Sequence, residues 1–515
     1  MTTVAGADQP LWQRLAAWDG PDQIDLAATK ADAPASDRNA ALLLVRLYPG
    51  QLHYVPGQPG KPGQWYVWDN RCHRPDQSNA IGRLLLHYAG EYQVMLRHAQ
   101  QNFNTWVANT NPQATGLDLT KLQAKMWKDE WGAITGYAAK LSSAAGLSAL
   151  RGVLGEICGV SADTMADRHP YFLNVANGIL DLRTGTLYDH DPAAMMTYCL
   201  DAGWDPAARC PKYQRLLYRS VGEVDETYTA LVKALGYSLI GENPFNKVIF
   251  LNGPPANGKT KLLQVLSTLL GPLAHNAEPS LVTRQRDGRN AREEHAIRGV
   301  RAICISETSS GIHMDEAQLK RLTGETEITT HQHYAVTKNR TMVTWLIIFA
   351  TNAMPSILHL DAGVLRRLLV FPMGPSIPEI ERDDTLVAQI LAEELSGVLA
   401  LLAWGCQAAL AEKFMEHTLP TSVIAETAQY VLDQDTIETW LAERAMADLP
   451  ADLNGHRPKE QPALLWTSYH KYFGPTPHLN RTEFLAGLNG RHGVERSMDK
   501  RWFYGITLHD DEWVR

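Results

Sequence analysis

The chain has 515 residues, a length that corresponds to about three to four domains of ordinary size. Hydrophobic residues make up 45% of the sequence and charged residues 20%, as in a globular protein that buries its own core, which argues against a disordered chain. The formal net charge of −8 argues against a protein that wraps nucleic acid over its outer surface. The longest apolar runs are well short of the roughly 20 residues of a membrane span. We therefore expect a cytoplasmic protein.

Four regions follow one another along the chain. Residues 1–40, rich in Ala, Asp, Gln and Pro, are predicted to be a flexible leader. Residues 41–205 combine strand and helix patterns with a hairpin pattern at 174–185, and are expected to form an α/β or mostly helical domain. Strand-like and helix-like runs alternate over 206–420, which predicts an α/β domain with a parallel sheet. For residues 421–515, two helical patterns and two short strand patterns predict a helical linker followed by a small domain.

The strongest motif follows an apolar strand pattern at 247–252. The sequence Gly-Pro-Pro-Ala-Asn-Gly-Lys-Thr at 253–260 satisfies G-x-x-x-x-G-K-[ST] and precedes a helical run, as a phosphate loop (P-loop) does. In such a loop backbone N–H groups face the phosphates, Lys259 reaches the β and γ oxygens, and the Thr260 hydroxyl ligates Mg²⁺. We therefore predict ATP and Mg²⁺ as cofactors. The predicted contacts are Gly253, Pro254, Pro255, Ala256, Asn257, Gly258, Lys259, Thr260 and Lys261.

Polar side chains follow the next two apolar strand patterns. The strand pattern at 300–306 is followed by Glu307, a carboxylate that can orient and deprotonate the attacking water and can contribute to the metal site. Only one acid stands here, where such ATPases usually carry a pair. The pattern at 344–351 is followed by Asn352, whose amide can contact the γ-phosphate or the lytic water. The simpler interpretations are a solvated acid at the end of a strand for Glu307 and a turn-forming Asn before a Pro for Asn352.

Two groups of basic residues complete the predicted site. Arg366 and Arg367 precede another apolar strand, and one of them is predicted to enter the active site of a neighbouring subunit as an arginine finger. The residues alone do not decide between the two. Lys338 and Arg340 stand where two strand-like runs meet, which predicts a hairpin with both cations at its tip. These cations and His333 are candidates for binding DNA, although a solvated turn explains the same pattern equally well.

The order of these motifs resembles the superfamily 3 helicases, and more narrowly the phage and plasmid primase-helicase family, which includes the poxvirus primase-helicase. The stretches at 65–69 and 177–181 resemble the domain that precedes the motor in that family. The resemblance implies an AAA+-like ring, usually a hexamer, that translocates 3′ to 5′ on single-stranded DNA during replication of a phage, plasmid or other mobile element in a bacterial host. Single-stranded and forked DNA and further copies of the chain are the implied partners.

Two expectations concern the ends of the chain. No D-x-D constellation with a partner His stands out before residue 170, so primase activity is not expected here and a separate primase is a possible partner. The last region resembles the winged-helix ending of the family. A basic cluster near its expected wing has two equally good interpretations, duplex binding and a solvated face. It comprises Arg491, His492, Arg496, Lys500 and Arg501.

Two other functions fit the same motifs. The first is a P-loop ATPase that acts as a switch or a defence component without unwinding DNA, and ATP turnover that ignores single-stranded DNA would favour it. The second is a DNA-binding initiation module whose assembly is regulated by the nucleotide, and ATP binding with negligible turnover would favour it.

Overall fold

The structure is a computed structural model. It describes residues 35–57, 62–109, 132–161, 165, 169–283, 291–306, 313–325, 327–330, 339–357, 362–413, 416–434, 436–452, 455–474 and 479–509. The chain divides into two compact units, the first built mainly from residues up to 201 and the second mainly from residues 202 onward. Most of the predicted leader lies outside the described residues, and the first described helix begins at Asp37, inside the range predicted for the leader.

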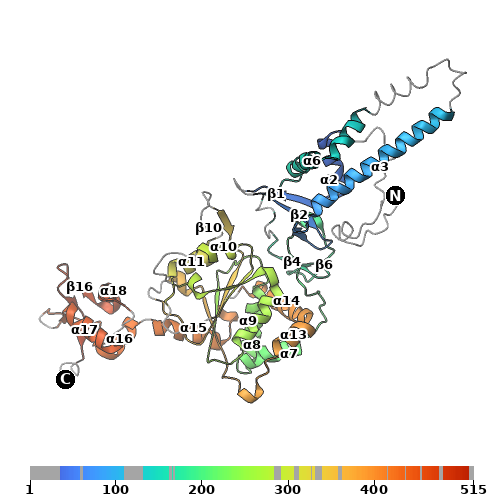
Figure 1. The fold of residues 1–515 in the computed structure, drawn as a ribbon. Coiled ribbons are helices and arrows are strands. Elements are labelled where there is room, and N and C mark those ends of the chain that lie inside the picture. The colour runs from blue at the N-terminus through green and yellow to red at the C-terminus, as the bar shows by residue number, and fades with distance from the viewer. Residues whose placement is uncertain are drawn as a thin grey trace. The chain divides into compact units, whose positions relative to one another are not determined.

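The first unit is a mixed α/β structure, which agrees with the expectation for residues 41–205. A three-stranded antiparallel sheet in the order β1-β2-β3 packs with helices around one core. Trp65 and Val67 alternate along the middle strand, so both enter this core. The elements are α2 (Asp37–Leu47), β1 (Leu52–Val55), β2 (Gln64–Trp68), β3 (His73–Pro75), the long helix α3 (Ala80–Asn109) and α6 (Ala144–Ile157) (Figure 1).

The hairpin pattern predicted at 174–185 is confirmed. Three short strands form a sheet in the order β4-β5-β6, with β5 and β6 antiparallel. Their bounds are Phe172–Val175, Gly178–Asp181 and Leu187–Tyr188. The turn after β5 is closed by Asp181, whose carboxylate accepts hydrogen bonds from the backbone and guanidinium of Arg183.

The second unit contains a parallel five-stranded sheet, as predicted for 206–420. The strand order is β13-β7-β12-β9-β8, and every neighbouring pair is parallel. The strands are β7 (Val248–Asn252), β8 (Ala274–Ala277), β9 (Ala302–Ser306), β12 (Leu346–Thr351) and β13 (Leu368–Pro372). Because all five run in the same direction, the residues that follow them emerge at one edge of the sheet.

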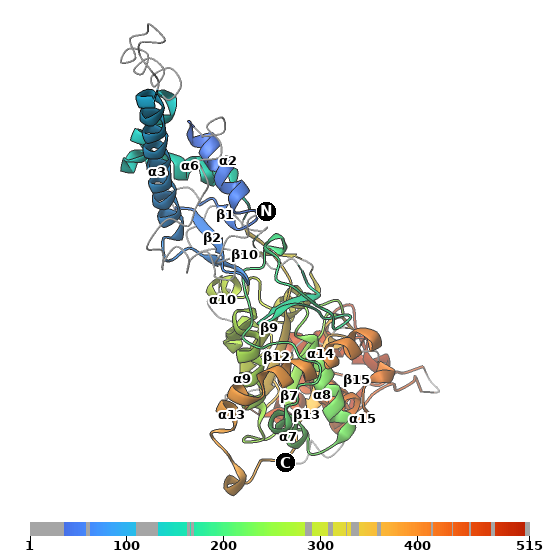
Figure 2. The ribbon, with the colours of Figure 1, turned by 90° about the vertical axis from the view of Figure 1, so that its right-hand side faces the viewer.

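Both faces of this sheet are covered. Alternate residues such as Val248 and Phe250 join a core that also contains Leu319 and Leu322 of α11 (Glu316–Gly324). On the other face α9 (Lys259–Leu270) contacts β8, β9 and β12, and the pair α8 (Asp225–Tyr237) and α14 (Leu395–Glu412) packs together. In Figure 2, α8, α9 and α14 lie in front of strands β7 and β12. The strands are therefore buried on both sides, which explains their continuous apolar sequences.

Helix α15 (Thr421–Gln434) belongs to this core, although its residues were predicted to begin a linker. Its Tyr430 is buried among the strand residues and donates a hydrogen bond to the carbonyl of Pro355 at 2.6 Å. Its Thr427 hydroxyl accepts from the backbone N–H of Val370 at 3.0 Å. That N–H belongs to β13, the edge strand, so α15 covers an edge that would otherwise be open.

Helix α14 is also long and apolar enough to cross a membrane by length and composition alone. Its buried residues pack against α8, and Gly405 lies so close that an added Cβ would meet the carbonyl oxygen of Val232 at 2.4 Å. This helix is therefore part of the core of the second unit.

The carboxy-terminal part has its own core around Trp440, Tyr469 and Phe484. Its helices and strands are α16 (Thr436–Arg444), β14 (Ala445–Met446), β15 (Lys459–Glu460), α17 (Pro462–Phe473), α18 (Arg481–Leu488), β16 (Glu495–Arg496), β17 (Phe503–Tyr504) and β18 (Thr507–Leu508). Three of the strands pair in the order β15-β17-β16, and β14 pairs with β18. The two helices and two strands predicted for this region are present.

Candidate functional site

The predicted phosphate loop connects β7 to α9 at the carboxyl edge of the parallel sheet. Gly258 precedes the helix with φ +98°, a left-handed conformation that favours glycine. A Cβ at this position would lie 2.5 Å from the Ser220 hydroxyl oxygen and 3.1 Å from the Leu216 side chain. The second glycine of the motif is therefore required by the backbone conformation and by the close approach of α7 (Pro211–Ser220). The amino terminus of α9 faces this loop without a side-chain cap, as an anion site requires.

Lys259 lies under the loop and is held by the oxygen atoms of the loop. Its ammonium group donates to the carbonyls of Gly253 at 2.7 Å and Pro254 at 2.8 Å, and to the amide oxygen of Asn257 at 2.9 Å. Only 5% of the residue is exposed, and this burial lowers the pKa of Lys259 from 10.5 to about 8. All three partners are uncharged, so the cation lacks a counter-ion among the described residues that contact it. A phosphate group would supply that counter-ion.

A strap formed by residues 373–377 holds the loop from outside. The Ser376 hydroxyl donates to the carbonyl of Pro255 at 2.6 Å, and the N–H of Ile377 donates to the carbonyl of Ala256 at 2.8 Å. The Asn257 amide donates to the carbonyl of Gly374 at 3.2 Å. This strap follows β13 directly, so the phosphate loop and the edge of the sheet are fixed to each other.

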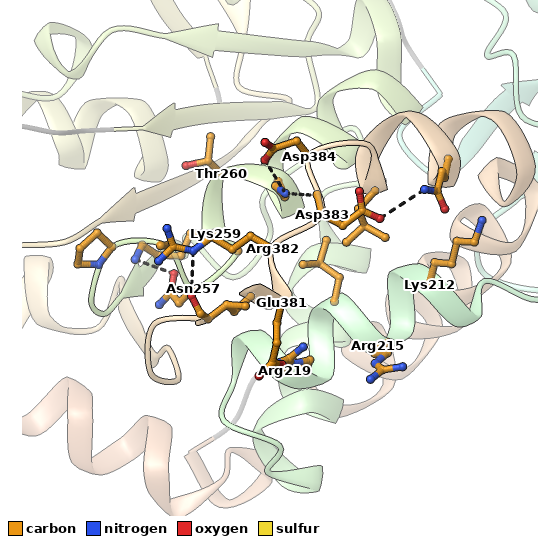
Figure 3. A pocket seen from close by; sticks show the side chains of 18 of the residues that line it. Lys212, Arg215, Arg219, Asn257, Lys259, Thr260, Glu381, Arg382, Asp383 and Asp384 are labelled. Carbon is orange, nitrogen blue, oxygen red and sulfur yellow. Dashed lines mark hydrogen bonds and ion pairs between the residues drawn. The ribbon is translucent and has the colours of Figure 1, made fainter. Parts of the chain in front are cut away.

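A pocket of about 690 Å³ opens above the loop. One wall is α7, from which Lys212, Arg215 and Arg219 project, as Figure 3 shows. The opposite wall is the segment 381–389. Arg219 donates to the Glu381 carboxylate at 2.5 Å across the pocket. Basic groups therefore surround the loop on several sides, which suits a ligand carrying several negative charges.

Lys261 and Thr260 occupy the first turn of α9 beside the pocket. Lys261 donates to the backbone carbonyl of Asp383 at 2.5 Å and lies 3.9 Å from the fully exposed Asp384 carboxylate. Thr260 is exposed and lines the pocket, so its hydroxyl is open to a ligand. Magnesium prefers oxygen ligands and usually shares its shell with water and substrate phosphates. A Thr hydroxyl next to a phosphate site fits that requirement, and no group of three or more His, Cys, Asp or Glu among the described residues forms a separate metal site.

Asn352 also lines the pocket, as predicted. It follows β12, which pairs with β7 in parallel so that Thr351 stands opposite Asn252. Asn352 is exposed, and its side chain is available to a ligand. The adjoining strand β9 ends at Ser306, opposite Ala350, whereas Glu307 lies outside the described residues. The structure thus brings Asn352 to the loop and leaves the position of Glu307 as a prediction.

The two adjacent arginines have different surroundings. Arg367 is 6% exposed, and its guanidinium donates to the Thr323 hydroxyl at 3.0 Å and to the carbonyl of Gly363. The side chain of Arg366 is exposed and has no hydrogen bond or ion pair with any described residue. Its carbonyl accepts from Lys247 at 2.8 Å, which fixes the backbone. Arg366 is therefore presented to solvent and Arg367 holds α11 to the sheet edge.

The predicted DNA-binding hairpin exists as two paired strands. Strands β10 (Glu327–Thr330) and β11 (Asn339–Met342) are antiparallel, with Thr329 opposite Arg340. Lys338 and His333 lie in the connection, outside the described residues. The two strands of the predicted hairpin are present, but Arg340 is the second residue of β11 and does not stand at the tip, as had been predicted. Contacts of the hairpin with DNA stay a prediction.

The basic residues of α7 that line the pocket had not been predicted from the sequence. Lys212, Arg215 and Arg219 lie on one face of α7, at helical spacings of three and four residues. That spacing was visible in the sequence, but it carried no motif. Their position opposite the phosphate loop depends on how α7 packs against it.

The parallel sheet with its pocket at the carboxyl edge defines an α/β unit built to hold an anionic ligand. Residues 41–222 match the family described as "D5 N terminal like", and this stretch is the D5-type region of the chain. The chain is 25% identical over 227 residues to "Putative helicase L207/L206" of Acanthamoeba polyphaga mimivirus. That alignment covers 40% of this chain and spans 22% of the length of the mimivirus protein. Both matches agree with the resemblance to the phage-type primase-helicases that the sequence predicted.

Solved structures of the apo C-terminal region of NrS-1 are also similar at a low level. One has 14% sequence identity and a TM-score of 0.32, and covers 47% of this chain and 58% of that chain. Another has 12% identity and a TM-score of 0.34, and covers 60% and 77%. The fold is established by the strand order of the parallel sheet, and TM-scores this low add nothing to it.

Proposed function

We propose that the chain is the motor of a replicative DNA helicase that hydrolyses ATP. The observation that supports this most directly is the buried Lys259 in a glycine-shaped loop at the mouth of a basic pocket. A nucleoside triphosphate has the charge and length to fill that pocket. In this proposal the loop holds the phosphates, and the pocket between α7 and 381–389 holds the sugar and base.

The residues of the site have distinct proposed roles. Lys259 leaves its carbonyl partners and binds the β and γ oxygens, and the Thr260 hydroxyl contributes to the magnesium site. The metal, when bound, neutralises charge that develops on the transferred phosphoryl group. Glu307 accepts the proton of the attacking water, and Asn352 orients that water or contacts the γ-phosphate. Lys259, Thr260 and Asn352 stand at the carboxyl edge of the sheet, where neighbouring parallel strands end.

Arg366 is the better candidate for the arginine finger. An arginine that acts on a neighbouring subunit must be free in the isolated subunit, and Arg366 is exposed whereas Arg367 is engaged by Thr323 and Gly363. An active site that takes its arginine finger from a neighbouring subunit works only in an assembly whose subunits meet head to tail. Such contacts form a ring when the rotation between subunits closes. We propose a homo-oligomer that surrounds single-stranded DNA, with six subunits as the family resemblance implies.

Other parts of the chain support the same assignment. The order β15, α17, α18, β16, β17 at the carboxy terminus, with the three strands in one sheet, supports a winged helix. The hairpin β10–β11 supports a role for Lys338, Arg340 and His333 at the DNA. The family match is consistent with a protein that acts inside the host cell at a replication fork, together with a separate primase.

ATP hydrolysis measured with and without single-stranded DNA tests the proposal. We expect turnover that rises with DNA in the wild-type protein and disappears in Lys259→Ala. Thr268→Ala is the matched control, because Thr268 lies on the exposed side of the same helix and outside the pocket. Turnover that is unchanged by DNA would refute a translocating motor and favour the switch-like ATPase.

A further inference from the structure

The pocket above the phosphate loop has a part that the loop itself does not reach. Figure 3 shows Arg215 of α7 at one end of the pocket, away from Asn257 and Lys259 of the loop. Helix α13 (Leu386–Glu393) packs against both α7 and α9, and its Gln389 lines the pocket. A nucleotide whose phosphates lie on the loop would extend its sugar and base into this part. Gln389 is therefore a candidate for recognising the base.

The segment before α13 is tied to the loop side of the pocket. Lys261, in the first turn of α9, donates to the backbone carbonyl of Asp383 at 2.5 Å. One oxygen of the Asp383 carboxylate accepts from the Thr385 hydroxyl at 2.6 Å and from the Thr385 N–H at 2.8 Å. The hydrogen bond from the Thr385 hydroxyl is the main cause that lowers the pKa of Asp383 below its usual 3.8. This carboxylate is therefore ionised at neutral pH.

The amide of Gln389 has its orientation fixed by these two neighbours. The amide nitrogen lies 2.8 Å from the Thr385 hydroxyl oxygen and 3.4 Å from the other carboxylate oxygen of Asp383. A hydroxyl has one proton, and the Thr385 proton must lie in the 2.6 Å contact with the ionised carboxylate. The Thr385 oxygen can then only accept from Gln389. The NH2 group of Gln389 must face these oxygens, because the reversed amide would place its own oxygen against a carboxylate.

The amide oxygen of Gln389 is consequently left as a free acceptor. No described residue donates to it, and the side chain is only partly buried in the pocket wall. The 6-amino group of adenine donates a hydrogen bond, whereas the 6-oxo group of guanine only accepts one. An acceptor of fixed orientation in this part of the pocket therefore favours adenine and disfavours guanine.

Arg215 offers a contact that lacks this selectivity. Its side chain is exposed, lines the pocket and has no hydrogen bond or ion pair with any described residue. A planar guanidinium stacks on the faces of aromatic rings, and every base has such a face. Arg215 can thus add affinity for any nucleotide, while Gln389 can distinguish one base from another.

We propose that Gln389 selects adenine nucleotides by accepting a hydrogen bond from the 6-amino group of the base, with Thr385 as the positioning residue. This inference rests on the proposed function, because it requires that the loop bind the phosphates of a nucleoside triphosphate. It adds the part of the ligand that the loop leaves unread, since a phosphate loop contacts groups that all nucleoside triphosphates share.

Isothermal titration of the full chain with Mg²⁺ and the non-hydrolysable analogues AMP-PNP, GMP-PNP and IMP-PNP tests the proposal. Inosine has the 6-oxo group of guanine without its 2-amino group, so the third analogue isolates position 6. The wild-type protein should bind AMP-PNP about tenfold more tightly than either of the others, because they leave the Gln389 acceptor facing a second acceptor.

Four variants separate selectivity from affinity. Gln389→Leu should lose the preference for AMP-PNP and still bind GMP-PNP as the wild type does, which shows that its site is folded. Thr385→Val should also lose the preference, because the amide can then rotate, whereas Thr385→Ser keeps the hydroxyl and should retain it. Arg215→Ala should weaken all three analogues alike.

A matched control is available on α15. The amide of Gln429 donates to the Asp433 carboxylate at 2.7 Å, and this residue is exposed and lies outside the pocket. Gln429→Leu should leave all three affinities unchanged.

The outcomes separate this inference from the proposed function. Equal affinities in the wild type, or an unchanged preference in Gln389→Leu, would overturn the role of Gln389 and leave the motor untouched. IMP-PNP binding as tightly as AMP-PNP would also overturn it, because discrimination would then lie at the 2-amino position. A preference that depends on Gln389 in a protein whose turnover ignores single-stranded DNA would refute the motor and leave the inference standing. A wild-type protein that binds none of the three analogues would overturn both.

Discussion

Replacing Gly258 by Ala tests whether the shape of the phosphate loop is set by its contact with α7. The substitution forces a left-handed φ of +98° on a residue with a Cβ, which costs about 1–2 kcal/mol. The new Cβ would also meet the Ser220 hydroxyl oxygen at 2.5 Å, and overpacking of this kind costs about 1–3 kcal/mol. Together these terms predict a loss of roughly 2–5 kcal/mol, which lowers the melting temperature of the unit that contains the parallel sheet by roughly 5–15 °C.

Two variants divide this loss into its parts. Gly299 has φ +76° and open space where a Cβ would be added. Gly299→Ala should therefore show the cost of the left-handed backbone alone. Ser220→Ala removes a buried hydroxyl that has no hydrogen-bond partner among the described residues, so by itself it should cost little. Combined with Gly258→Ala, it should recover the steric part of the loss.

Scanning calorimetry with and without an ATP analogue is the assay. We expect Gly258→Ala to melt below Gly299→Ala and to lose the stabilisation by nucleotide. The double variant Gly258→Ala/Ser220→Ala should melt close to Gly299→Ala. If Gly258→Ala melts no lower than Gly299→Ala, or if Ser220→Ala recovers nothing, the contact between α7 and the loop does not shape the site.

Four other predictions concern Lys259, the two adjacent arginines and the hairpin. Burial lowers the pKa of Lys259 from 10.5 to about 8, so the folded protein releases this proton at a lower pH than the unfolded chain does. The free energy of unfolding of the nucleotide-free protein should therefore increase as pH rises from about 8 to 10.5. The gain should be missing in Lys259→Met, and melting curves at pH 7 and pH 9.5 check it. Arg366→Ala should keep ATP binding but lose turnover. Mixing Arg366→Ala subunits with Lys259→Ala subunits should restore part of the turnover. No recovery in the mixture would contradict a role of Arg366 across the subunit interface. Arg367→Ala should instead lower the melting temperature, because the Thr323 hydroxyl loses its buried partner. Lys338→Ala should keep basal turnover and lose stimulation by single-stranded DNA, whereas equal loss of both would exclude the hairpin role.

The sequence by itself determined the parts of this protein that depend on local patterns. The loop at 253–260 is recognisable because its glycines, its lysine and its threonine act within eight consecutive positions. The parallel sheet is predictable because strands buried on both faces have continuous apolar sequences. The position of Asn352 follows from the same logic, since the residue after a parallel strand emerges at the edge where the loop lies.

Only the tertiary structure decided which distant residues complete the site. Arg219 on one wall of the pocket and Glu381 on the other are 162 positions apart, and no local pattern relates them. Arg366 and Arg367 are identical neighbours in sequence, and they differ because one is exposed and the other is buried against Thr323. Helix α15 lies where the sequence predicted the start of a linker, yet its Tyr430 is buried in the core of the parallel sheet. Such contacts form between segments far apart in the chain, so burial and charge at these positions depend on packing, which local sequence does not encode.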